Sequence, residues 1–429
     1  MKIRRLLLFL WSIFFSYTIE ANGKVEALLD VLDYHVQITL KLASQQIEGK
    51  VTITFHAPPQ SREVAFDSGD LTVTQWEGDY IQAVKQQDGK TLVYLEEVND
   101  VPYRLTLSYQ GKPKRGLLFL EEALYTVYFT HHWMICHFDP ADHASMRMDI
   151  TLPKELICVA NGEHLQSITK DTTTTHSWRL DQASPAYTYG FTAGAFTQVS
   201  DSQGGKNIQY FSADYDASQL RQIFQYTPDM IAFFEEKTGI PYSQHTYSQV
   251  LVGNHYQEMA GFALLKRSYG RLVLRDSTET NLISHELAHQ WWGNRISCRS
   301  WKHFWLNEGF ATYMSAAYNE HRFGKEKYLK DIDSYFQVYQ KIKTKGNDKS
   351  LVFPNWLNPS VDDRNLVYFK GAYVLHCLRE ELGDEDFWKG IKHYSSAFYG
   401  KSVTTKDFQS AMEEATEKSL GHFFDEWVY

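Results

Sequence analysis

The sequence predicts an α+β fold in which a β domain precedes a mainly helical domain. Apolar and polar residues alternate along the first half of the chain, as they do in strands with one buried face. Past about residue 212 the apolar residues recur every three or four positions, which is the spacing of helices that bury one face. Because strands come first and helices follow, we expect two domains, at 24–211 and 212–429.

The first 23 residues are predicted to be a signal peptide. Lys2, Arg4 and Arg5 precede the almost wholly apolar stretch 6–19, and small residues follow around Ala21. This order is typical of export signals. The apolar run is shorter than the roughly 20 residues that span a bilayer, and an uncleaved anchor is the alternative. No later segment is apolar enough to span a membrane. We therefore expect an exported protein, periplasmic or secreted, without a stable membrane span after signal removal.

Strand patterns occupy most of the first half of the chain. Apolar residues take every second position in 34–42, 51–55 and 105–109, the period of a strand with one buried face. The Ala-Pro-Pro run at 57–59 separates two of these stretches and indicates a turn. Strands in tandem with little helix between them predict an antiparallel sheet.

Helical spacing begins after about residue 212. Apolar residues between Leu220 and Phe234 share one helical face, and Gly239 is placed to end that helix. Pro228 should kink the helix or split it. A strand is expected at 249–252. Further helices are expected around 282–292, 307–322, 365–381 and 404–415.

Composition narrows the classes of function. The chain has 429 residues, 43% of them hydrophobic, which is enough for two or three domains with full cores. Its net charge is −9 and no basic stripe is visible, so nucleic acid is not expected as a partner. The four cysteines fit no cysteine-based zinc site. Cys136 and Cys158 lie in one predicted β region and could pair, or all four could be buried free thiols.

One short motif indicates the chemistry. Residues 285–289 read His-Glu-Leu-Ala-His, and Glu308 follows His289 by 19 positions. Residues four apart share a face of a helix, so His285 and His289 can reach one ion and Glu308 can add an oxygen. Two nitrogens and a carboxylate leave the fourth position of a zinc site open to water, as in catalytic sites. Glu286 is then placed to take that water's proton.

Three segments resemble the zinc signature of the gluzincin aminopeptidases, the group that contains aminopeptidase N and leukotriene A hydrolase. They are 285–294, 305–313 and 368–372. The resemblance implies a saddle-shaped antiparallel β domain, in which 135–140 is similar to a bend of the family, followed by a thermolysin-like catalytic domain with one zinc ion. It also implies that Tyr368 donates a hydrogen bond to the developing oxyanion. A tyrosine at that place could instead merely pack in the core.

The substrate-binding stretch departs from the family pattern. Members that remove N-terminal residues carry Gly-x-Met-Glu-Asn, whose Glu binds the substrate's α-amine. If Met259 aligns with that Met, Ala260 and Gly261 replace the Glu and the Asn. Glu258 could take over, or it could be an exposed glutamate at a strand end. His131 stands where the family often has a Gln that contacts the same amine. Glu258, Met259, Ala260 and Gly261 are therefore the substrate-binding candidates.

These patterns predict an exported zinc metallopeptidase that acts on peptides. The leading hypothesis is an aminopeptidase that removes N-terminal residues with metal-activated water. An endopeptidase or oligopeptidase of the same chemistry is one alternative, because the amine-binding Glu is displaced. A catalytically silent peptide-binding protein is another. The resemblance also implies a short form without the family's C-terminal helical domain, and hence a more open cleft. The sequence predicts neither an oligomeric state nor a side-chain preference.

Overall fold

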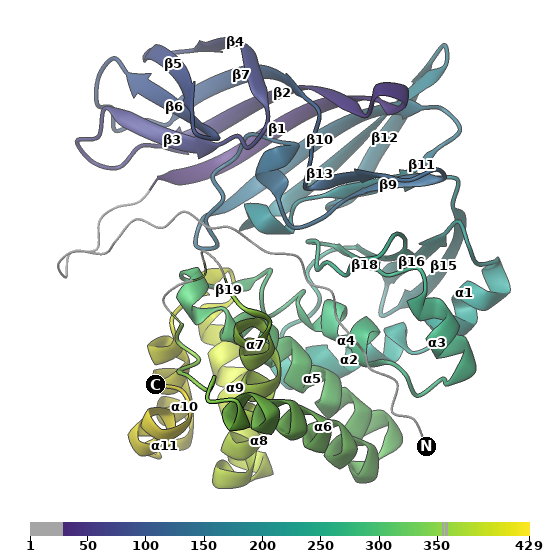
Figure 1. Cartoon of the computed structure of the whole chain (residues 1–429), viewed down its shortest axis with the longest axis vertical. Coiled ribbons are helices and arrows are strands. Elements are labelled where there is room, and N and C mark those ends of the chain that lie inside the picture. The colour runs from purple at the N-terminus through teal and green to yellow at the C-terminus, as the bar shows by residue number, and fades with distance from the viewer. Residues whose placement is uncertain (1–28, 354–355, 357–358) are drawn as a thin grey trace.

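The computed structural model describes residues 29–353, 356 and 359–429. Strands from the first half of the chain form a layer over a helical body built by the second half (Figure 1). This order confirms the predicted α+β class with the β domain first. The predicted signal peptide at 1–23 lies outside the described residues. Within the described residues, no helix is both long and apolar enough to cross a bilayer.

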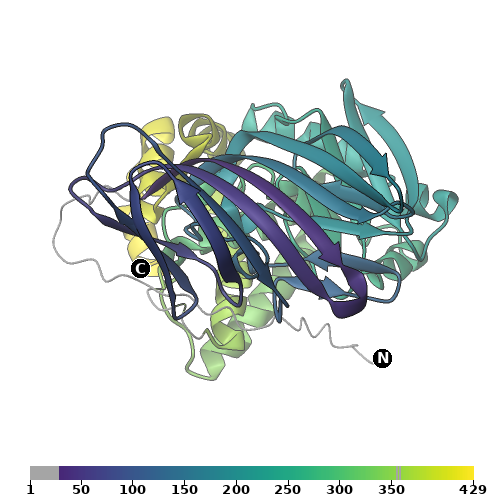
Figure 2. The same cartoon turned by 90° about the horizontal axis from the view of Figure 1, so that it is seen from above.

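Seven strands form the largest sheet, in the order β12-β13-β10-β1-β2-β7-β4. Alternation along β1 buries Tyr34, Val36 and Ile38, as the sequence predicted. Neighbouring strands pair antiparallel except β1 and β10, which pair in parallel through a long crossover that the sequence pattern did not reveal. Figure 2 shows the long strands side by side above the helical body. The strands are β1 (Asp30–Lys41), β2 (Gln46–His56), β4 (Thr72–Gly78), β7 (Tyr103–Gly111), β10 (His143–Pro153), β12 (Glu163–Lys170) and β13 (Thr173–Pro185).

Two smaller sheets complete the β domain, with the orders β3-β6-β5 and β11-β14-β9-β8. Their apolar side chains pack with those of the large sheet in one buried cluster that includes Val51, Phe55 and Phe66. The strands are β3 (Glu63–Asp67), β5 (Ile81–Gln87), β6 (Lys90–Leu95), β8 (Leu117–Phe119), β9 (Ala123–Thr126), β11 (Ile157–Ala160) and β14 (Phe191–Gly194).

A further sheet, in the order β15-β16-β17-β18, belongs to the edge of the helical body. Its strands are β15 (Thr197–Gln203), β16 (Lys206–Ser212), β17 (Thr246–Leu251) and β18 (Phe262–Leu265). The expected domain limit between 211 and 212 falls inside β16, which pairs in parallel with β17. Backbone hydrogen bonds thus group the hairpin that begins at Thr197 with the second half of the chain.

The helices follow the predicted pattern in most places. Pro228 splits the first predicted helix, because α1 ends at Ile223 and α2 carries the proline in its first turn. Gly239 ends α2 in a left-handed conformation, with φ 71°. The helices are α1 (Ala217–Ile223), α2 (Thr227–Thr238), α3 (Tyr269–Arg275), α4 (Asn281–Ala288), α5 (Trp305–Phe323), α6 (Lys325–Thr344), α7 (Val361–Asn365), a π-helix at Leu366–Lys370, α8 (Gly371–Leu382), α9 (Asp384–Phe398), α10 (Thr405–Thr416) and α11 (Gly421–Trp427).

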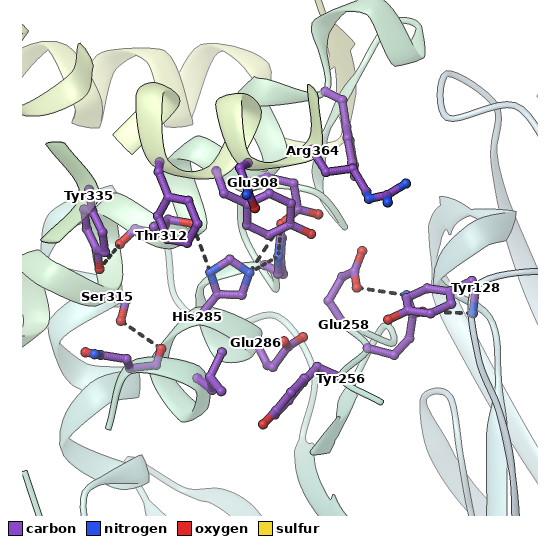
Figure 3. Close-up of a pocket in the computed structure, with 18 of the residues that line it drawn as sticks. Tyr128, Tyr256, Glu258, His285, Glu286, Glu308, Thr312, Ser315, Tyr335 and Arg364 are labelled. Carbon is purple, nitrogen blue, oxygen red and sulfur yellow. Dashed lines mark hydrogen bonds and ion pairs between the residues drawn. The ribbon is translucent and has the colours of Figure 1, made fainter. Parts of the chain in front are cut away.

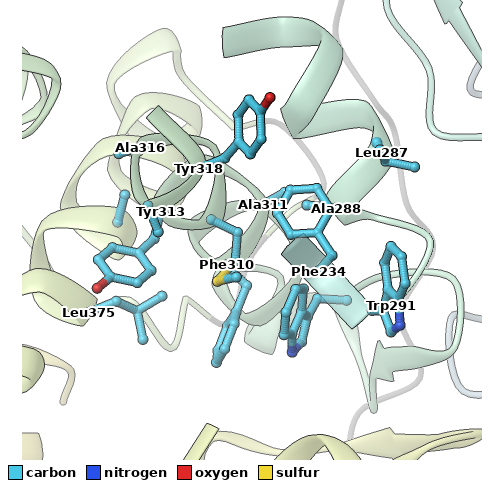
Figure 4. Close-up of a cluster of buried hydrophobic side chains, with 14 of the residues drawn as sticks. Phe234, Leu287, Ala288, Trp291, Phe310, Ala311, Tyr313, Ala316, Tyr318 and Leu375 are labelled. Atoms are coloured by element: carbon cyan, nitrogen blue, oxygen red, sulfur yellow. The ribbon is translucent and has the colours of Figure 1, made fainter. Parts of the chain in front are cut away.

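Helix α5 lies at the centre of the helical body and is buried from Trp305 to Asn319. Its apolar side chains meet those of α4 and of the turn that follows α4, as the cluster around Phe310, Leu287 and Trp291 shows (Figure 4). Each fully buried aromatic side chain of this kind stabilises the fold by about 2–3 kcal/mol. The core therefore fixes α4 and α5, the two helices that carry the predicted zinc ligands, relative to each other.

The cysteines do not cross-link the fold. All four carry free thiols, and burial raises the pKa of both Cys136 and Cys158. Of the two open interpretations, the structure has the free thiols rather than the disulfide.

Candidate active site

Helices α4 and α5 bring the three predicted zinc ligands together. His285 lies in α4, His289 directly follows the end of α4, and Glu308 lies in the first turn of α5. The Nε2 atoms of His285 and His289 are 3.1 Å apart. Oε2 of Glu308 lies 3.3 Å from Nε2 of His285 and 3.4 Å from Nε2 of His289. All three side chains are buried. Three ligand atoms therefore converge on one point.

The other ring nitrogens of both histidines are occupied. Nδ1 of His289 donates to the carbonyl of Trp292 at 2.9 Å. Nδ1 of His285 lies 3.4 Å from the hydroxyl of Thr312 (Figure 3). Such contacts orient a ligating imidazole and direct its Nε2 to the metal. The backbone carbonyl of Trp292 thus fixes the orientation of the His289 ring, and Thr312 of α5 fixes that of the His285 ring.

The chemistry of these three residues fits a zinc ion. Glu308 Oε2 is buried and has no hydrogen-bond partner, which is costly without a cation. Burial disfavours a charged ring at His289, yet Glu308, Glu258 and Glu286 together raise its pKa to about 10. The carboxylates thus draw positive charge into the cluster. Two nitrogens and one carboxylate oxygen are the ligands of a catalytic zinc site.

Glu286 lies beside the ligands, as predicted for a general base. Its carboxylate forms a compact group with the carboxylate of Glu258 and the ring of His289. One carboxylate oxygen or ring nitrogen from each of the three residues lies within 4.8 Å of the other two. Burial raises the pKa of Glu286 well above its ordinary value. The side chain lines the same cavity as the histidines (Figure 3).

Tyr368 lines the cavity rather than the core alone. Its ring stacks on that of His285, with centroids 5.8 Å apart and an angle of 14°. Burial raises the pKa of its hydroxyl well above 10, so the hydroxyl keeps its proton. The residue belongs to the π-helix, a form that often occurs at functional sites.

Two glycines allow Tyr368 to approach the ligands. A Cβ on Gly309 would lie 3.0 Å from the Cα of Gly371, and the reverse contact is equally close. Gly309 follows Glu308 directly, and Gly371 begins α8 three residues after Tyr368. The close backbone contact therefore sets the tyrosine beside the ligand. The buried Lys370 holds the π-helix from its other side by donating to Asp348 at 2.9 Å.

The structure corrects the expected alignment of the substrate-binding stretch. Met259 and Ala260 are buried in the cores, and neither lines the cavity. Gly261 is also outside the lining: its N–H donates to Gln290 and its carbonyl accepts from Ser248. Met259, Ala260 and Gly261 thus have structural contacts where substrate contacts were expected. The residue of this stretch that brings a carboxylate into the cavity is Glu258 (Figure 3).

Gln257 orients that carboxylate. Its amide nitrogen donates to Glu258 Oε2 at 2.8 Å, and its amide oxygen accepts from the N–H of Tyr128 at 2.9 Å. Tyr128 has φ 57°, a left-handed conformation that non-glycine residues rarely adopt. Partial enclosure raises the pKa of Glu258 to about 6. Glu258 is thus a fixed cavity group and not an exposed strand end.

His131 does not take part. It lies outside the cavity lining and packs its ring against Phe138, at a centroid distance of 4.7 Å. The hydroxyl of its neighbour Thr130 donates to Ala186 inside the fold.

The cavity has a volume of about 480 Å³ and mostly apolar walls. Of its aromatic lining residues only Tyr368 could be identified from the sequence, because the others come from segments far apart in the chain. The chain is 15% aromatic, but that share does not distinguish cavity walls from core. The aromatic lining residues are Tyr128, Phe129, Phe138, Tyr187, Tyr256, Tyr269, Trp301, Phe304, Tyr335, Trp356, Tyr368 and Phe369.

Fold and site together define a two-domain protein in which two histidines and a glutamate form a buried cluster that fits a catalytic zinc ion. Comparison with known proteins adds the family that the chain resembles. Residues 223–427 match the Peptidase family M1 domain. "Probable aminopeptidase 1" of Saccharolobus solfataricus is 23% identical over 91% of this chain and 52% of its own length. Human glutamyl aminopeptidase is 23% identical over 95% of this chain and 47% of its own. The chain thus spans about half the length of these curated relatives.

The solved structures that it resembles are of similar size. An M1 zinc metallopeptidase from Deinococcus radiodurans superposes with a TM-score of 0.80 at 22% identity, covering 93% of each chain. A variant of an M1 zinc metallopeptidase from Deinococcus radiodurans, solved with a Tyr-Ser-Ala substrate, gives the same TM-score. This likeness confirms the fold. The second half of the chain thus carries a Peptidase family M1 domain, and the chain as a whole is similar to aminopeptidases.

Proposed function

We propose that the protein is a zinc-dependent aminopeptidase. The observation that carries the proposal is the position of Glu258, whose carboxylate clusters with Glu286 and His289 in the cavity wall. A free α-amine is a cation at neutral pH, and a partly enclosed carboxylate binds it through charge-assisted hydrogen bonds. An amine bound there holds the first peptide bond beside the base and the ligands. Cleavage is then restricted to the N-terminal residue.

The roles of the other residues follow from their positions. His285, His289 and Glu308 would hold zinc, which when bound acts as a Lewis acid and lowers the pKa of water. Glu286 accepts a proton from the attacking water and returns it to the leaving amine. Tyr368 donates its hydroxyl hydrogen to the carbonyl oxygen as that oxygen becomes negative.

Replacing Tyr368 with Phe should lower kcat by about 100-fold, because it removes one donor to the oxyanion. Zinc content should not change, since the three ligands are untouched. Steady-state kinetics and metal analysis of the same preparation check both statements. Tyr335→Phe is the matched control, because that tyrosine lines the cavity with its hydroxyl 3.5 Å from the carbonyl of Thr312. An unchanged kcat in Tyr368→Phe would remove Tyr368 from the mechanism.

Glu258→Gln tests the aminopeptidase assignment. Loss of the charged acceptor should lower kcat/KM for aminoacyl anilides by about 10- to 100-fold. The wild-type protein should leave N-acetylated peptides uncleaved, and this selectivity should weaken in the variant. The measurement compares free and acetylated forms of one peptide by mass spectrometry. Glu279→Gln is the control, because Glu279 lines the cavity outside the cluster of Glu258.

Two outcomes of this comparison favour the alternative hypotheses. Cleavage of acetylated peptides by the wild-type protein, at the rate of free ones, makes it an endopeptidase or oligopeptidase. Zinc-loaded protein that cleaves nothing in a broad peptide library is a peptide-binding protein.

We also propose that the protein acts after export to the periplasm or the medium. The proposal rests on the charged start, short apolar run and small-residue exit of residues 1–23. N-terminal sequencing of the mature protein tests it, and a chain that retains Met1 in the cytoplasm contradicts it.

A further inference from the structure

We propose that Arg364 binds a carboxylate of the substrate and thereby selects short or acidic peptides. This inference rests on the proposed peptidase function and adds a substrate class to it. Arg364 lies in α7 and lines the cavity, and its side chain extends toward Glu258 and Tyr128 (Figure 3). It is the only arginine or lysine among the described residues that line the cavity.

The guanidinium of Arg364 has no acidic partner among the described residues. Two aspartates precede it, but each is engaged elsewhere: Asp362 pairs with Lys345 at 3.0 Å and Asp363 with Lys349 at 2.5 Å. Nη1 of Arg364 donates to the carbonyl of Pro359 at 2.9 Å. A guanidinium has five N–H donors in a planar fork, so most of them remain for a ligand.

The same ion pairs hold Arg364 in place. Asp362 also accepts from Asn347. In the cap of α7 the carboxylate of Asp363 accepts from the N–H of Ser360, and the N–H of Asp363 donates to the hydroxyl of Ser360. Helix α7 is thus tied to the segment that follows α6 at several points. A half-buried arginine on such a support loses little freedom when it binds a planar anion, which strengthens recognition.

The charges in the cavity suit a peptide with both termini close to the site. The carboxylates of Glu258 and Glu286 bring negative charge to the cavity, and Arg364 is the one basic side chain of the Arg or Lys type in its described lining. Tyr368 follows Arg364 by four residues, about 6 Å along a helix axis. An extended peptide advances about 3.4 Å per residue, so a carboxylate at Arg364 lies within about two residues of the bond beside Tyr368. Apolar walls lower the local dielectric and strengthen the contact.

Two sources can provide that carboxylate: the C-terminus of a dipeptide or tripeptide, or the side chain of Asp or Glu near the scissile bond. The experiment separates them with matched pairs of substrates. One pair is a tripeptide and its C-terminal amide. The other pairs are amidated peptides that differ only by Asp for Asn or Glu for Gln, at the first or the second residue. The quantity measured is the ratio of kcat/KM between the members of each pair.

The wild-type protein should prefer the acid by about 10- to 100-fold in at least one kind of pair. In Arg364→Gln that ratio should fall to near one. Arg364→Lys should give an intermediate ratio, because it keeps the charge and loses the fork. Arg275→Gln is the control: this exposed arginine ends α3, near the cavity wall but outside its lining, and its loss should preserve the wild-type ratio.

The ratio of kcat/KM for the acid and the amide is insensitive to partial misfolding, because both substrates meet the same fraction of folded protein. A binding measurement gives a second, independent test. Calorimetry measures binding of the tripeptide and of its amide to two inactive variants. Glu286→Gln should bind the acid more tightly than the amide, and the double variant Glu286→Gln/Arg364→Gln should lose this preference. Equal use of acid and amide by the wild-type protein in every pair overturns the inference, as does a preference that survives in Arg364→Gln. If no peptide is cleaved at all, the proposed function fails, and the calorimetric preference alone decides the role of Arg364.

Discussion

Glu286→Gln is expected to lower kcat for every peptide substrate by about 10²- to 10⁴-fold while the protein keeps its zinc. The carboxylate of Glu286 lies next to the ligands in a buried cluster, where glutamine has the same size but cannot accept the proton of the attacking water. His285, His289 and Glu308 remain intact in the variant. Single-turnover and steady-state kinetics, with metal analysis of the same sample, check both parts.

The conservative variant Glu286→Asp serves as a control for this prediction. It keeps a carboxylate and withdraws it by one methylene, so its kcat should lie between those of the wild type and Glu286→Gln. A Glu286→Gln variant that turns over near the wild-type rate would show that another group transfers the proton. Loss of zinc in that variant would indicate instead that Glu286 supports the metal site.

Removal of the metal is expected to abolish peptide hydrolysis and to lower Tm. Without a metal ion the buried Oε2 of Glu308 has only the rings of His285 and His289 beside it, and the carboxylates of Glu308 and Glu258 both repel that of Glu286. A ligand that binds only the folded protein stabilises it by mass action, so its loss destabilises. Activity and Tm should be followed during dialysis against a chelator and again after addition of stoichiometric Zn²⁺.

Glu308→Gln is the matched variant for this experiment, because it keeps the shape of the ligand and removes its charge. It should resemble the chelated wild type and should not recover on addition of Zn²⁺ at the same concentration. Hydrolysis that persists at the full rate in chelator, with no metal left in the sample, would exclude zinc from the reaction.

The clustering of the three proposed zinc ligands could be predicted because their arrangement is local. His285 and His289 are four residues apart next to one helix, and Glu308 begins the buried helix that packs on it. The strands were predictable for a similar reason, since the period of two in β1 reports a single buried face. In both cases a few neighbouring residues determine the geometry.

The remainder of the site depends on contacts between distant segments. The alignment at Met259 failed because burial of its side chain against Gly190, far away in the sequence, sets which neighbour faces the cavity. The backbone N–H of Tyr128 donates to the side-chain amide oxygen of Gln257 across the domain junction. The π-helix that presents Tyr368 depends on close packing of Gly309 on Gly371. No periodicity in the sequence encodes these contacts.

The same reasoning explains the errors in topology. The parallel pair of β1 and β10 joins strands more than 100 residues apart, where an antiparallel sheet was expected. The sequence at 202–205 left a hairpin and a linker open, and the structure has the hairpin, between β15 and β16. Pairing of distant strands is decided by the whole domain, so a strand's own pattern does not reveal its partner.

The most direct test of the account is the metal content of the purified protein, measured together with the location of the ion. Elemental analysis should find one zinc per chain, and anomalous diffraction at the zinc edge should place it between the Nε2 atoms of His285 and His289 and the carboxylate of Glu308. Protein that is active without stoichiometric metal, or an ion bound away from these three side chains, would contradict the central claim.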